Sequence, residues 1–138
     1  MRRIFFLLQI IFGVLFLWSG VVKALEPAAF SSTIATYGIL PGSLINAAAI
    51  FLPWIEIAAG AALFTGRFAP GALLILNLLL VVFLGALSLN IFNGVNASCG
   101  CFSIDPAGAS MREALIRNIV LLCLGSLLMW QSFRGNKV

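Results

Sequence analysis

The sequence predicts an all-α fold, an integral-membrane four-helix antiparallel bundle with a short interfacial helix between spans 1 and 2. Of the 138 residues, 62% are hydrophobic and 9% are charged, and the mean hydropathy is +1.16. This composition is too apolar for a soluble domain of the same length. Turn-forming residues also divide the chain into four apolar runs that are long enough to cross a bilayer. We therefore expect residues 1–138 to form a single transmembrane domain.

The first span is expected over about residues 4–23. Arg2 and Arg3 precede its apolar run, as they would in a secretory signal peptide. The run is longer than the apolar core of about 7–15 residues that such peptides contain. We therefore expect it to be retained as a transmembrane helix that ends at Lys23.

A short helix is expected next, over residues 27–38. Glu26-Pro27 is a helix-start signal, and Gly38 is a stop signal. The segment is too short and too rich in Ser and Thr to cross a bilayer. We expect it to lie at the membrane interface, with Phe30, Ile34 and Tyr37 toward lipid or protein.

The remaining spans are expected over about residues 44–64, 70–92 and 111–133. Thr65-Gly66-Arg67 forms the turn between the second and third spans, and Asn93-Gly94 ends the third. Pro53 removes a backbone hydrogen bond within the second span and should bend it. Ser110 and Glu113 have the spacing of a capping box, which starts the fourth span.

The basic residues favour one orientation in the bacterial inner (cytoplasmic) membrane, because Lys and Arg are enriched in cytoplasmic loops. We expect both termini to be cytoplasmic. The basic residues inside are then Arg2, Arg3, Arg67, Arg134 and Lys137, and those outside are Lys23, Arg112 and Arg117. The loop between the third and fourth spans is therefore expected in the periplasm.

That loop carries Cys99-Gly100-Cys101-Phe102. A disulfide between cysteines one residue apart needs an unusual backbone conformation, which glycine adopts at the least steric cost. We expect a strained and accessible Cys99–Cys101 disulfide that is redox-active. The alternative is a static disulfide, which would stabilise the fold little because it closes almost no loop.

Three polar residues are expected at similar depths inside the spans. Gln9, Glu56 and Asn77 all fall roughly 9–14 Å from the cytoplasmic ends of their spans at 1.5 Å per residue. An ionisable residue inside a membrane is a functional-site hypothesis. We predict that Glu56 handles protons, and the alternative is that it hydrogen-bonds Asn77 or Gln9 to hold helices together.

A second polar group is expected near the level of the cysteine loop: Lys23, Asn90, Arg112, Arg117 and Asn118. A cation beside a thiol favours the reactive thiolate, and Lys23 is the strongest candidate for that role. The alternative for Lys23 is that its side chain extends to the membrane interface and keeps its ammonium in water. The alternative for Arg112 and Arg117 is that they only anchor their helix at the interface.

Two further residues receive weaker expectations. Cys123, in the fourth span, should be buried and act as a small hydrophobic residue, or else serve as a third, resolving thiol. Trp54, next to Pro53, should help shape a cavity or act as an interface anchor.

Some classes of function are disfavoured by composition. The chain contains no histidine, so it lacks the commonest zinc ligand and the usual general base. Its eight Lys and Arg residues are scattered at the edges of apolar runs despite a net charge of +4. We therefore expect no nucleic-acid-binding patch and no metal site of the usual His-containing kind, and the sequence does not indicate an oligomeric state.

Several short motifs follow one another along the chain, and together their order and spacing are specific to one protein family. They are Ser19-Gly20-Val21-Val22-Lys23, Glu26-Pro27, Tyr37-Gly38-Ile39-Leu40-Pro41, Leu52-Pro53-Trp54-Ile55-Glu56 with Gly60, Gly94, Cys99-Gly100-Cys101-Phe102 and Arg117-Asn118. Through these motifs the chain resembles the methylamine utilisation protein E (MauE) family, within the DoxX-like group of small four-helix membrane proteins. The resemblance covers about Gly13 to Phe133. It implies a role in maturing periplasmic proteins, with MauE linked to disulfide formation in the methylamine dehydrogenase small subunit beside a thioredoxin-like partner.

The leading hypothesis is a membrane thiol–disulfide oxidoreductase. It would pass electrons between a periplasmic thioredoxin-like protein and another carrier, such as a membrane quinone, with Cys99 and Cys101 as the reacting pair and Glu56 or Lys23 handling protons. One rival is the binding or transport of a soft metal ion by the two thiolates. The other is a non-catalytic assembly subunit whose cysteines lock a loop.

Overall fold

The fold of this chain is all-helical throughout the described residues, 1–94 and 111–135, of a computed structural model. Its helices are α1 (Arg2–Leu25), α2 (Pro27–Thr36), α3 (Gly42–Phe64), α4 (Ala69–Phe92) and α5 (Met111–Gly135). The all-α prediction is confirmed. Four of these helices, α1, α3, α4 and α5, are long and apolar enough to cross a membrane. The chain is accordingly a multi-pass membrane protein whose surroundings are a lipid bilayer.

The helix ends lie close to the expected span boundaries, within two residues at each end of the four long helices. The short helix α2 stops at Thr36, before the expected end at residue 38. Gly38 has a φ of +63°, a left-handed conformation that ends the helical path. Pro53 lies inside α3, which continues as a helix on both sides of it.

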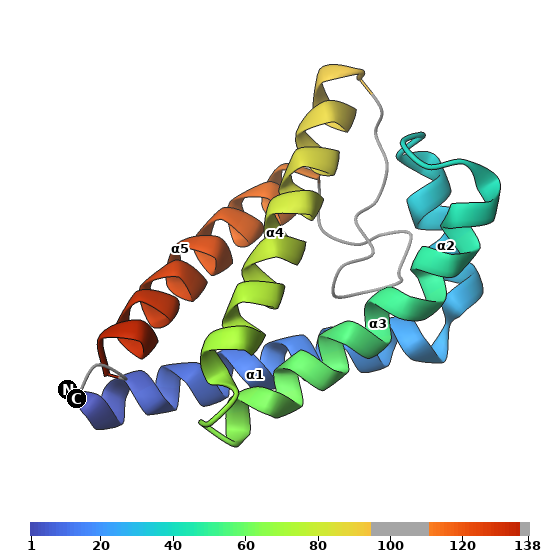
Figure 1. Cartoon of the computed structure of the whole chain (residues 1–138). Helices are drawn as coiled ribbons and strands as arrows, with labels where there is room; N and C mark the ends of the chain where they lie inside the picture. Colours follow the sequence, from blue (N-terminus) through green and yellow to red (C-terminus); the bar gives the residue numbers. More distant parts are fainter. Residues whose placement is uncertain (95–110, 136–138) are drawn as a thin grey trace.

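The four long helices form two antiparallel pairs. Figure 1 shows α1 lying alongside α3, with α4 and α5 forming a second pair that is inclined to the first. The pairs meet where α4 follows α3, and they diverge toward the opposite ends of α4 and α5. Helix α2 packs against α3 near the end of α1. The expected antiparallel arrangement is thus built from two helix pairs that are inclined to each other.

Small residues let α1 and α3 approach closely. A Cβ added to Gly13 would lie 3.0 Å from the carbonyl oxygen of Gly60, and one added to Gly20 would lie 2.9 Å from that of Pro53. Membrane helices pack in this way because they lack a hydrophobic driving force against lipid and depend on close backbone contact. These glycines therefore determine the register of α1 on α3.

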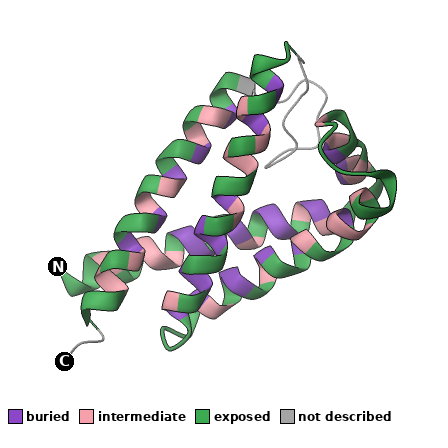
Figure 2. Cartoon of the chain, turned by 45° about the horizontal axis from the view of Figure 1, so that its top comes forward, coloured by how far each residue is buried: buried purple, intermediate pink, exposed green. Residues whose placement is uncertain are grey.

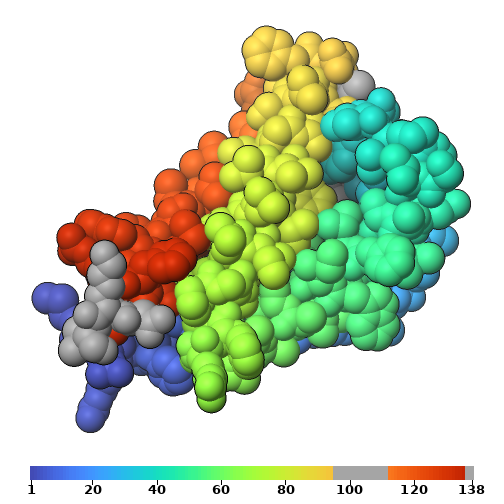
Figure 3. Space-filling view, in the orientation of Figure 1, coloured from blue at the N-terminus to red at the C-terminus, as the bar shows by residue number. Residues whose placement is uncertain are grey.

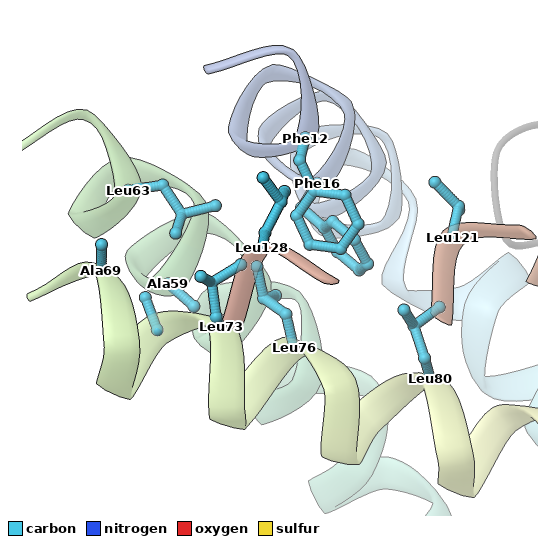
Figure 4. Close-up of a cluster of buried hydrophobic side chains, with 11 residues drawn as sticks. Phe12, Phe16, Ala59, Leu63, Ala69, Leu73, Leu76, Leu80, Leu121 and Leu128 are labelled. Carbon is cyan, nitrogen blue, oxygen red and sulfur yellow. The ribbon is translucent and has the colours of Figure 1, made fainter. Parts of the chain in front are cut away.

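The main core lies where the two pairs meet. Figure 4 shows Phe12 and Phe16 of α1 among leucines from the other three long helices, including Leu63, Leu76 and Leu128. The two phenylalanine rings have centroids 4.9 Å apart and are tilted against each other. Because this core draws on every long helix, it anchors both pairs at the same end of the molecule.

The outer faces of the long helices are exposed and apolar. Figure 2 shows exposed residues along the outside of each helix, with buried ones facing inward. The exposed side chains include Trp18, Phe51, Leu78 and Val120, one from each long helix. A water-soluble protein does not expose so continuous an apolar surface, and here these side chains contact the hydrocarbon of the bilayer.

Candidate functional site

A buried ion pair between Lys23 of α1 and Glu56 of α3 is the central feature of the interior. The Lys23 Nζ atom donates to Oε1 of Glu56 across 2.7 Å, and the two side chains are 2% and 1% exposed. Charged groups are expensive inside a bilayer unless they are paired. The structure thus brings together two residues that the sequence placed at different depths.

The register of α1 on α3 explains this pairing. Gln9 of α1 donates to the carbonyl oxygen of Leu63 across 2.7 Å, and Gly20 lies against Pro53 and Ile57. The first residues of α1 therefore extend beyond the end of α3. Lys23 lies one turn past Gly20, and its side chain points back along α1 toward Glu56. The sequence-based estimate counted the depth of each residue from the end of its own span, so it did not include the offset between the ends of α1 and α3.

Three further side chains surround the pair. Ser19 donates through Oγ to Oε2 of Glu56 across 3.2 Å. The Lys23 ammonium lies 5.3 Å from the ring centroid of Phe30 in α2 and 5.0 Å from that of Phe83 in α4. Aromatic faces attract a cation, most strongly where water is excluded. The pair is therefore held by residues from α1, α2, α3 and α4.

The two amides expected near Glu56 lie elsewhere. Gln9 bonds the Leu63 backbone, and Asn77 in α4 donates to the Met129 sulfur of α5 at 3.9 Å. The alternative in which Glu56 bonds Gln9 or Asn77 is therefore wrong. Asn77 Oδ1 has no partner within residues 1–94 and 111–135, and it packs against Gly125, where an added Cβ would overlap it.

Lys23 is buried, so the alternative of a lysine extending to the interface is also wrong. A lysine that extends outward needs a path to water along the surface. The packing of α2 over the end of α1 closes that path, since Phe30 of α2 lies against the ammonium. The role of Lys23 beside a thiol remains a prediction.

Polar residues also line the contact between α4 and α5. Asn90 and Asn118 are 2% and 3% exposed, and Asn90 Nδ2 donates to the carbonyl oxygen of Ala86 in its own helix. Arg117 is half-buried, whereas Arg112 is exposed. Leu87 packs against Ala114, so these residues lie near the ends of α4 and α5 that the cysteine-containing segment joins.

Two weaker expectations are corrected. Cys123 is exposed on α5 rather than buried, because the face of α5 that packs on α4 carries Leu121, Gly125 and Leu128 instead. Trp54 is 63% exposed on the outer face of α3. Its neighbours Pro53 and Glu56 take the inward positions, so Trp54 does not shape an interior cavity.

The predicted reacting pair lies outside the described residues. Cys99, Gly100, Cys101 and Phe102 all belong to the segment between α4 and α5, as does Ser110, the first residue of the expected capping box. Their chemistry is therefore argued from the sequence. Among residues 1–94 and 111–135, no three His, Cys, Asp or Glu side chains lie together in a way that could hold a metal ion.

Sequence reasoning missed Ser19 and Phe83 as neighbours of the buried pair. Ser19 lies four residues before Lys23, one helical turn away, and that spacing was a usable signal. Phe83 lies in an unbroken apolar run of α4 with no distinguishing pattern. Only the contacts of its ring with Lys23 of α1 and with the cluster that contains Phe30 and Ile34 of α2 identify it.

Two comparisons with known proteins give matches to this chain. The model of the family described as methylamine utilisation protein MauE matches residues 1–131. The methylamine utilization protein MauE of Paracoccus denitrificans is 28% identical over 118 residues, which cover 85% of this chain and 63% of that protein. The matched region thus spans less than two thirds of the relative. No solved structure matches this chain.

Proposed function

Because this chain belongs to the methylamine utilisation protein MauE family, we propose that it serves methylamine utilisation as a membrane thiol–disulfide oxidoreductase. In this proposal Cys99 and Cys101 exchange disulfides with a thioredoxin-like protein in the periplasm. That partner in turn acts on periplasmic proteins that need their disulfides formed. The proposal combines the family with the Cys-Gly-Cys sequence and the buried charged pair.

The Lys23–Glu56 pair is the observation that carries the proposal. A buried ion pair is weak evidence for a stabilising role, because apolar residues of similar volume often stabilise as well or better. An ionisable pair inside membrane helices is more readily explained by proton handling. Thiol–disulfide chemistry involves proton transfer, since each thiol loses its proton before it reacts.

The location of the pair agrees with this role. Lys23 touches Phe83 of α4, and α4 ends at Phe92 before the cysteine-containing segment begins. Nine residues of helix correspond to roughly 14 Å. The pair therefore lies near the end of α1 and roughly 14 Å along α4 from Phe92, the residue at which α4 ends.

The exchange itself proceeds in two balanced steps. The thiolate of one cysteine attacks the partner's disulfide, one partner sulfur leaves as thiolate, and a mixed disulfide forms. The second cysteine then attacks its neighbour's sulfur in the mixed disulfide. This step releases the partner as a dithiol and leaves Cys99 bonded to Cys101, and the same steps reverse when the partner is oxidised. In this scheme Glu56 accepts and returns protons.

Trapping the mixed disulfide tests the proposal. With Cys101→Ser or Cys99→Ser, the remaining thiol cannot be resolved, so we expect one variant to accumulate a covalent complex with a thioredoxin-like protein. The complex should be visible as a reducible band after acid quenching of membranes and should be identified by mass spectrometry. The Cys123→Ser variant is the control and should accumulate no complex.

Two outcomes would contradict the proposal. Methylamine-dependent growth that survives the Cys99→Ser/Cys101→Ser double substitution would indicate a non-catalytic assembly subunit. Stoichiometric copper bound by the chain after anaerobic purification, with no trapped partner, would indicate thiolate metal binding instead.

A further inference from the structure

An apolar cavity of about 150 Å³ lies between α2, α3 and α4. Figure 3 shows these three helices meeting on one face of the molecule, in cyan, green and yellow-green. Ile34 of α2, Ala48 and Leu52 of α3, and Leu79, Phe83 and Ala86 of α4 line the cavity. The cavity arises because α2 and α4 both pack on α3, while the backbones of α2 and α4 do not approach each other closely.

The lining determines what the cavity can hold. All but one of its lining residues are aliphatic or phenylalanine, and the exception is Tyr37. A charged or strongly polar ligand would lose its hydration there without replacement. Apolar cavities of this size stay dry and bind ring-sized molecules such as benzene. A lipid acyl chain is much longer than such a cavity.

The cavity is reached from the membrane. Val82 and Ile39, at its rim, are exposed on the apolar outer surface of the described helices. A ligand therefore enters from the hydrocarbon, which restricts it to molecules that dissolve in the bilayer.

Phe83 links the cavity to the buried charges. Its ring lines the cavity and lies 5.0 Å from the Lys23 ammonium. A ring bound against Phe83 is thus one side chain away from the Lys23–Glu56 pair. This position suits a ligand that exchanges protons as well as electrons.

We propose that this cavity binds the ring of a membrane quinone. The choice of a quinone rests on the proposed function, because the dithiol and disulfide forms of Cys99 and Cys101 differ by two electrons and two protons. A quinone and its hydroquinone differ by the same two electrons and two protons, so a quinone oxidises the dithiol to a disulfide and leaves as hydroquinone. The cavity itself is formed by described residues of α2, α3 and α4.

Photolabelling of the full chain tests the site. The probe is an azido-ubiquinone with one isoprene unit, used in nanodiscs of saturated phospholipid. We expect saturable labelling in peptides from residues 34–40 or 79–86. Ala48→Phe fills the cavity, and we expect it to lower this labelling about tenfold. Ala58→Phe, which makes the same change on the exposed face of α3, should leave it unchanged.

The remaining outcomes are decisive. Labelling that spreads evenly over lipid-facing peptides, or that persists in Ala48→Phe, would overturn the site. If iodobenzene protects the cavity peptides from labelling but unlabelled ubiquinone does not, the assignment of a quinone as the ligand would be overturned. The Cys99→Ser/Cys101→Ser variant should still be labelled, because neither cysteine lines the cavity. If the native chain shows no saturable labelling while the single Cys→Ser variants still trap a partner, the cavity is refuted and the proposed function stands.

Discussion

At the scale of single residues, the Lys23–Glu56 pair is the most expensive feature of the fold. Both side chains are almost completely buried, and Ser19, Phe30 and Phe83 supply the rest of their surroundings. Removing one partner leaves the other as an uncompensated charge in a medium of low dielectric. Removing both eliminates that cost, so the double substitution should lower the free energy of unfolding less than either single substitution does.

We predict that Lys23→Met and Glu56→Met each lower the free energy of unfolding in detergent by about 3–5 kcal/mol. The double variant Lys23→Met/Glu56→Met should recover most of that loss yet remain inactive in partner exchange. Equilibrium unfolding followed by circular dichroism measures the first effect, and the trapping assay measures the second.

The control for this double-mutant cycle is Glu26→Gln, which neutralises an exposed glutamate. Its effect should stay within about 0.5 kcal/mol. An active double variant would assign the pair a structural role only. A double variant whose loss equals the sum of the two single losses would show that the two side chains do not interact.

At the scale of helices, the contact between α1 and α3 brings the pair together. Gly13, Gly20 and Gly60 lie at this contact, and each faces backbone atoms of the other helix. Their missing side chains let α1 slide past α3 to the register in which Lys23 reaches Glu56. The glycine positions are thus an indirect requirement of the site.

We predict that Gly20→Ala destabilises the protein by about 1–3 kcal/mol. The added Cβ would lie 2.8 Å from Cγ1 of Ile57 and 2.9 Å from a backbone oxygen, so the helices must separate. Gly85→Ala in α4 is the matched control, because nothing lies within 4 Å of its added Cβ. That change should stabilise the helix by about 0.5–1 kcal/mol. Unfolding in detergent distinguishes the two, and equal effects would refute close packing at Gly20.

At the scale of the whole molecule, the buried pair changes the expected distribution of charge. Glu56 neutralises Lys23 inside the protein, so Lys23 no longer counts as an outer interfacial cation. In the predicted orientation, Arg112 and Arg117 then remain outside, and the basic residues inside are Arg2, Arg3, Arg67, Arg134 and Lys137. This larger difference strengthens the predicted orientation with cytoplasmic termini.

We predict that a membrane-impermeant maleimide labels Cys99 or Cys101 in intact cells after mild reduction, in a Cys123→Ser background. A cysteine introduced by Thr65→Cys, at the turn after α3, should react only after the cells are broken. The latter variant carries Cys99→Ser and Cys101→Ser so that one thiol is present. The reverse pattern of labelling would invert the topology and place the exchange reaction in the wrong compartment.

The membrane helices were predictable because their signals are local. Apolar length, Gly and Pro punctuation and the solvent preference of a bilayer act on neighbouring residues, and the long helices differ from the expected spans by at most two residues at either end. Glu56 and Lys23 were also recognisable individually, because ionisable residues are conspicuous in apolar runs.

The sequence by itself therefore determined the helices, the all-α class and the candidate polar residues. Only the tertiary structure decided that Lys23 meets Glu56, that Phe83 joins them, and that α2, α3 and α4 enclose an apolar cavity. The physical reason is that these contacts depend on how far one helix extends past another. That offset arises from glycine contacts between segments far apart in the chain, which helix length and local periodicity do not encode.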